Sequence, residues 1–72
     1  MEVRLFATFR ENRDKILDVP WYEGMDGNAL FKMLDIDVKE VSIFLVNGAH
    51  KKPDYVFAKD DVIALFPPVG GG

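Results

Sequence analysis

No cysteine occurs among the 72 residues, so neither a disulfide nor a Cys-ligated zinc site can stabilise the fold. The chain is short enough for one domain only, and a domain of this size buries only about 60% of its unfolded-chain surface. Hydrophobic residues make up 49% of the sequence, which is sufficient for a small core without cross-links. The absence of cysteine is compatible with a reducing compartment.

The sequence also has little basic charge and no long apolar run. Nine Lys and Arg residues against twelve Asp and Glu residues give a net charge of −3, which disfavours nucleic-acid binding because phosphate neutralisation requires an excess of basic residues. No stretch approaches the roughly 20 apolar residues of a membrane span, and no signal peptide is evident. We therefore expect a cytoplasmic protein with no nucleic-acid or membrane partner, whose acidic surface favours basic partner proteins.

Residues suited to catalysis are few. The one histidine, His50, follows the Asn47-Gly48 dipeptide beside two lysines, so no Ser–His–Asp or Cys–His set can be assembled from this sequence. Adjacent carboxylates at Asp60-Asp61 are typical of a turn before a strand. We therefore expect no enzyme activity of the chain on its own, no metal site and no bound cofactor.

Alternating apolar residues predict two strands at the start of the chain, over residues 2–8 and 15–19, joined by a polar hairpin loop. The buried face of the first strand is expected to carry Val3, Leu5 and Ala7. Phe6 falls on the opposite, polar face, where it can cover a sheet edge or a partner site.

A short helix is predicted over about residues 27–35, with Asp26 as its N-cap because a carboxylate can accept a hydrogen bond from a free amide of the first turn. Its apolar stripe is expected to consist of Leu30, Met33 and Leu34, with Phe31 beside it. A helix of this length is unstable alone, so it must pack on the sheet.

Residues 41–46 give the clearest strand pattern, and their nearly continuous apolar character predicts a central strand buried on both faces. The Asn47-Gly48 dipeptide that follows predicts a tight turn. Residues 55–57 are expected to add a short strand, and residues 62–66 to form the last one. This order predicts an α+β, β-grasp (ubiquitin-like) fold, a mixed four- to five-stranded sheet with one packed helix.

We expect residues 1–66 to form this domain and residues 67–72 to form an extended, glycine-rich tail. Two prolines cannot donate hydrogen bonds to a sheet, and glycine makes a segment thin because it lacks a Cβ. Such a segment can thread a narrow channel in a partner and deliver a terminal carboxylate; it comprises Pro67, Pro68, Val69, Gly70, Gly71 and Gly72. The other interpretation is a frayed terminus without function, and the residues alone leave both open.

The aromatic residues Phe6, Phe44 and Phe66 exceed what one small core face needs. They either fill the core or form an exposed apolar patch, where interface energy tends to concentrate. If the tail is functional, Phe66 beside it is the best candidate anchor for a partner, followed by Phe6.

The closing segment Phe-Pro-Pro-Val-Gly-Gly-Gly, residues 66–72, resembles the C-terminal signature of the MoaD/ThiS sulfur carriers, and most of all the molybdopterin synthase small subunit (molybdopterin converting factor subunit 1). Residues 3–11 resemble the first strand and following loop of that family. The tripeptide Val-Asn-Gly at residues 46–48 matches the turn after its central strand.

This resemblance implies that a ubiquitin-activating-like adenylyltransferase uses ATP and Mg²⁺ to adenylate the Gly72 carboxylate, and that a sulfur donor enzyme then supplies the sulfur of a thiocarboxylate. Docked in a molybdopterin synthase large subunit, the carrier would give this sulfur to a pterin precursor in molybdenum cofactor biosynthesis. Alternatives are a sulfur carrier for thiamine or another pathway, a ubiquitin-like modifier conjugated to lysines through Gly72, and a binding module with an inert tail.

Overall fold

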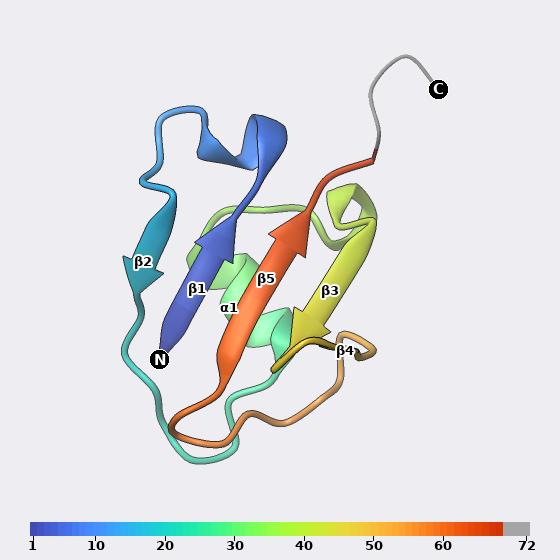
Figure 1. Cartoon of the computed structure of the whole chain (residues 1–72). Helices are drawn as coiled ribbons and strands as arrows, with labels where there is room; N and C mark the ends of the chain where they lie inside the picture. The colour runs from blue at the N-terminus through green and yellow to red at the C-terminus, as the bar shows by residue number, and fades with distance from the viewer. Residues whose placement is uncertain (69–72) are drawn as a thin grey trace.

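Five strands form one mixed sheet, and a single α-helix crosses one of its faces in the computed structural model, which describes residues 1–68 (Figure 1). The strands are β1 (Glu2–Leu5), β2 (Ile16–Asp18), β3 (Ile43–Val46), β4 (Ala49–His50) and β5 (Val62–Phe66). The helix is α1 (Gly27–Met33), and two 3₁₀ turns are η1 (Ala7–Arg10) and η2 (Val38–Glu40). The strand order is β2-β1-β5-β3-β4, so the predicted β-grasp architecture is confirmed.

The central strand of the sheet is β5, which pairs in parallel with β1 and antiparallel with β3. Leu65, near its end, lies opposite Leu5 on one side and Phe44 on the other. The prediction that residues 41–46 form the central strand, buried on both faces, is therefore wrong. Strand β3 is the second strand from the sheet edge. Its outward-facing side chains are only half-buried, because α1 covers only the opposite face of the sheet.

The core lies between the sheet and α1, and Phe44 is at its centre. The Phe44 ring makes edge-to-face contacts with Phe31 of the helix at 5.2 Å and with Phe57 at 6.0 Å between ring centroids. The buried hydrophobic residues are Val3, Leu5, Phe9, Val19, Met25, Leu30, Phe31, Ile36, Phe44, Val46, Phe57, Ile63 and Leu65. Phe44 is therefore a core residue, and only two of the three phenylalanines singled out from the sequence remain available to a partner.

Helix α1 begins as predicted but is shorter and presents a different face. The Asp26 carboxylate accepts a 2.9 Å hydrogen bond from the Ala29 amide, which confirms the N-cap. The predicted stripe was wrong at Met33, which is 47% exposed, because the buried stripe instead runs through Leu30 and Phe31. Within residues 1–68, no helix has both the length and the apolar character needed to cross a bilayer.

Strand β1 ends three residues before the predicted boundary. Ala7 has a φ of +54°, so the chain turns there into η1 and the Ala7 side chain is exposed rather than buried. The core position is filled by Phe9 instead, which is 4% exposed. The turn is held by Arg10, whose Nε donates a 2.8 Å hydrogen bond to the Leu5 carbonyl.

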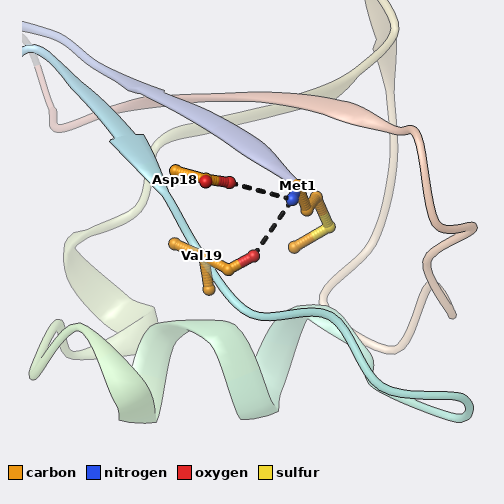
Figure 2. A network of polar contacts seen from close by, with 3 residues as sticks. All are labelled: Met1, Asp18 and Val19. Carbon is orange, nitrogen blue, oxygen red and sulfur yellow. Dashed lines mark hydrogen bonds and ion pairs between the residues drawn. The ribbon is translucent and has the colours of Figure 1, made fainter.

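The start of β1 is tied to the end of β2 at the edge of the sheet (Figure 2). The Met1 ammonium group lies 3.0 Å from the Val19 carbonyl oxygen and 3.4 Å from an Asp18 carboxylate oxygen. The Val19 amide donates in return to the Met1 carbonyl at 2.9 Å. The carboxylate of Asp18 is fully exposed, so its ion pair contributes little, and the backbone bonds fix this edge.

The segment between β4 and β5 has little regular structure, and the strand predicted for residues 55–57 reduces to one bridge between Val56 and Asp26. The Phe57 amide donates to the Met25 carbonyl at 2.8 Å, and the Phe57 carbonyl accepts from Trp21 Nε1 at 3.1 Å. The segment thus closes the core next to the N-terminus of α1.

Gly27 starts α1 beneath this segment, and a Cβ there would lie 2.6 Å from the Pro53 carbonyl oxygen and 2.9 Å from the Phe44 ring. Alanine usually stabilises a helix relative to glycine, but overpacking costs about 1–3 kcal/mol. We therefore expect Gly27→Ala to lower the free energy of unfolding by about 1–3 kcal/mol in urea denaturation. The control is Asn28→Ala on the exposed side of the same turn, which should be neutral or slightly stabilising; equal stability of both variants would contradict this packing.

Candidate functional site

The site predicted from the sequence begins where β5 ends. The last strand pairings are a 3.2 Å hydrogen bond from the Phe6 amide to the Leu65 carbonyl and a 2.9 Å bond from the Ser42 amide to the Phe66 carbonyl. Pro67 and Pro68 follow and have no amide hydrogen to donate. The chain therefore leaves the sheet at this point, at the end opposite the N-terminus and next to η1 (Figure 1).

Phe6 and Phe66 form a stack at this exit. Their ring centroids are 4.2 Å apart and their planes are inclined by 10°, and both residues are half-buried. The guanidinium carbon of Arg10 lies 5.1 Å from the Phe6 ring centroid, within the range of a cation–π interaction. The structure thus brings together the two residues predicted as partner contacts and places the guanidinium of Arg10 beside them.

The stack continues into an apolar surface on the face of the sheet that α1 does not cover. The register places Ile43 beside Phe66 and Leu45 beside Ala64, and all four are half-buried. We call this surface the open-face patch; it consists of Phe6, Ile43, Leu45, Ala64 and Phe66. A contiguous apolar surface beside a chain exit is the kind of feature that marks a protein interaction site.

The other predicted site residues divide into two groups. Pro67 is half-buried and Pro68 is exposed, next to the Phe6–Phe66 stack. Val69, Gly70, Gly71 and Gly72 lie outside the described residues, so their predicted roles stay predictions.

A second polar cluster lies at the opposite end of β5, around Asp61. Asp61 is 6% exposed and is the one buried charged side chain among residues 1–68. Its carboxylate accepts hydrogen bonds from Asn47 Nδ2 at 2.8 Å, from the Ala58 amide at 2.7 Å and from the Tyr55 hydroxyl at 3.4 Å. The Asn47 Oδ1 accepts from the Val62 amide at 2.9 Å, so the cluster fixes the first residue of β5.

The sequence analysis interpreted Asp60-Asp61 as turn residues, and the structure places them in a turn. The sequence alone could not show that only one of the two carboxylates would be buried, or that Asn47 would reach this carboxylate from a separate hairpin. Within the part of the chain that the structure describes, no three His, Asp or Glu side chains are arranged to hold a metal ion.

Tyr55 has a raised pKa, first because its phenol is partly desolvated and then because the Asp61 charge and hydrogen bond favour the neutral form. The neutral phenol contributes to the stability of the fold. This contribution is fully present below the ordinary tyrosine pKa of about 10, and it is lost as pH rises through the higher pKa of Tyr55 in the folded chain. We expect absorbance titration to show a phenolate transition above pH 10 that Tyr55→Phe abolishes. If the transition that Tyr55→Phe abolishes lay at or below pH 10, the contact with Asp61 would not raise the pKa of Tyr55.

Comparison with known proteins agrees with this geometry. Residues 3–72 match the model of the ThiS family. Among solved structures, the crystal structure of SAMP1 from Haloferax volcanii is similar, with a TM-score of 0.77 and 22% sequence identity over 99% of this chain and 97% of that chain. At that identity the likeness shows the fold alone. No curated protein matches the chain significantly.

Proposed function

The chain belongs to the ThiS family of small ubiquitin-like proteins, which act as sulfur carriers or protein modifiers, and from this we propose that it is a sulfur carrier whose working group is the carboxylate of Gly72. The reaction we propose has two stages. An activating enzyme first converts the carboxylate into an acyl-adenylate, and a sulfur donor then converts the adenylate into a thiocarboxylate.

The observation that carries this proposal is the direct continuation of the central strand into the proline-glycine segment. β5 is hydrogen-bonded to β1 on one side and to β3 on the other, so Phe66 has a fixed position when the chain leaves the sheet. A segment that starts from a fixed point can adopt fewer conformations. It therefore loses less conformational entropy when it enters a partner. Residues 67–72 would therefore form the arm that carries the reacting group, as the sequence analysis expected.

The chemistry assigned to the carrier is limited to one carboxylate. A carboxylate is a poor electrophile, so one of its oxygens must first attack the α-phosphorus of ATP, releasing pyrophosphate. A sulfur nucleophile then attacks the acyl carbon and AMP leaves. The guanidinium of Arg10, which lies beside the Phe6 ring at the tail exit, cannot take part in proton transfer because it stays protonated. The proposal therefore gives the catalytic groups, ATP and Mg²⁺ to an activating adenylyltransferase.

We assign the carrier to the molybdopterin branch, as the small subunit of a molybdopterin synthase whose large subunit uses the thiocarboxylate to introduce sulfur into a pterin precursor. The support is the Phe66-Pro67-Pro68 segment, which starts the signature on which the resemblance rests. A carrier for thiamine or another product, and a modifier conjugated through Gly72, are the alternatives. The two carrier branches differ in the enzyme that consumes the Gly72 thiocarboxylate, and the modifier differs from both because Gly72 forms an isopeptide bond instead.

The open-face patch is the surface that we propose for docking. We expect Phe6→Ala to weaken binding to the activating enzyme by at least about tenfold, since aromatic anchors at the centre of an interface carry most of its energy. The control is Tyr22→Ala, which removes an aromatic side chain that is 51% exposed outside the patch and should leave the affinity unchanged. Affinities from isothermal titration calorimetry, with thermal melts of both variants, would test this; equal losses would contradict a specific patch.

The carrier chemistry itself is tested by intact mass spectrometry after incubation with ATP, Mg²⁺, a sulfur source and the activating enzyme encoded by the same organism. We expect the mass gain of an oxygen-to-sulfur exchange, localised to Gly72 by fragmentation. Gly72→Ala should fold normally, because the buried core lies within residues 3–65, yet transfer sulfur much more slowly because a Cβ next to the carboxylate obstructs a narrow channel.

The outcomes separate the alternatives. A thiocarboxylate that a molybdopterin synthase large subunit consumes would support the proposed branch, and one that only a thiamine-forming enzyme consumes would move the carrier to the other. No exchange, with the enzyme active on another carrier, together with isopeptide bonds from Gly72 to cellular lysines, would support the modifier. Normal sulfur transfer by Gly72→Ala would contradict the threading argument.

A further inference from the structure

The turn between β3 and β4 contains a reactive dipeptide, and this turn has no role in the sulfur chemistry above. Asn47 and Gly48 occupy the turn with φ values of +53° and +83°. They form the one Asn-Gly pair among the three asparagines of the chain, since Asn12 precedes an arginine and Asn28 an alanine. The pair lies next to Asp61, at the end of β5 that is remote from the tail.

An Asn-Gly pair is prone to deamidation because glycine has no Cβ to shield its backbone nitrogen. That nitrogen can attack the side-chain carbonyl carbon of the asparagine. A new C–N bond closes a succinimide ring, the bond from the carbonyl carbon to the side-chain nitrogen breaks, and the proton lost by the glycine amide leaves with ammonia. Water then opens the ring at either carbonyl, giving aspartate or isoaspartate with no oxidant or cofactor.

In the folded chain both ends of the reacting carboxamide are held. Nδ2 donates to the buried Asp61 carboxylate at 2.8 Å, and Oδ1 accepts from the Val62 amide at 2.9 Å. The Asn47 side chain must leave both partners before it can rotate toward the Gly48 nitrogen. That rotation would also remove one of the donors that stabilise a carboxylate only 6% exposed, which makes the open arrangement unfavourable.

We propose that Asn47 is a guarded deamidation site, which survives while the Asn47–Asp61 contact is closed and reacts once the hairpin opens. The product of the reaction cannot restore this contact. An aspartate at position 47 has no donor for Asp61 and would bring a second negative charge to a partner position 2.8 Å away. An isoaspartate would in addition lengthen the backbone inside a two-residue turn. In either case the hydrogen bond between position 47 and Asp61, at the start of β5, is lost.

The test compares deamidation of the same chain folded and unfolded. Samples are incubated at mildly alkaline pH with and without a denaturing concentration of urea, and residue 47 is followed by peptide mapping that separates asparagine, aspartate and isoaspartate. We expect conversion at Asn47 to be at least about tenfold slower in the folded chain. Asn28, which precedes alanine, is the internal control and should stay intact in both samples.

Two variants connect the protection to the Asp61 contact. Asp61→Ala removes the acceptor and should deamidate faster than the wild-type chain under folding conditions, with the folded fraction verified by circular dichroism. Tyr55→Phe removes a different donor to Asp61 and leaves the Asn47 contact in place, so its rate should match the wild type. The Asn47→Asp variant represents the product, and its melting temperature should be lower.

Equal deamidation rates in the folded and unfolded chains would overturn the proposal, because the contact would then give no protection. A wild-type melting temperature for Asn47→Asp would overturn its second half, the destabilisation caused by losing the contact with Asp61. If Asp61→Ala fails to fold, two measurements still test the proposal: the deamidation rates of the wild-type chain with and without urea, and the melting temperature of Asn47→Asp. None of these outcomes depends on the sulfur-carrier function.

Discussion

The pairing of β5 on both sides is the constraint on which the rest of the structure depends. Because β5 lies between β1 and β3, its alternate side chains must face either α1 or solvent. Ile63 and Leu65 face α1 and are completely buried, which holds the helix, while Ala64 and Phe66 face outward and form the open-face patch. One strand of five residues thus contributes to the core, to the open-face patch and to the point where the chain leaves the sheet.

The two ends of β5 are held by different kinds of contact. At its start, a buried carboxylate and a carboxamide from another hairpin hold Val62 through polar contacts. At its end, the stacked rings of Phe6 and Phe66 hold the exit through an apolar contact that is still accessible to a partner. A polar network specifies one geometry. The exposed part of a half-buried aromatic pair, in contrast, can contact either water or the surface of another protein.

Local patterns in the sequence predicted most of the fold, and their failures have a common cause. The N-cap at Asp26, the Asn47-Gly48 turn and the last strand depend on neighbouring residues, and each prediction was confirmed. The positions of Ala7 and Met33, the central strand and the Asn47–Asp61 contact depend on segments far apart in the chain. For the site, the sequence indicated Phe6 and Phe66 as partner contacts, but their stacking follows only from the parallel pairing of β1 with β5.

The pairing of β5 on both sides has a mechanical consequence. A pull directed along β5 on the chain beyond Phe66 loads the hydrogen bonds of β5 with β1 and with β3 in shear, because these bonds lie across the strand direction. Hydrogen bonds loaded in shear must break at the same time, whereas hydrogen bonds pulled apart from the open end of a hairpin can break one after another. A partner that draws the arm into its active site would therefore extend the arm before it peels a strand from the sheet, and the domain could pass from one enzyme to the next without unravelling.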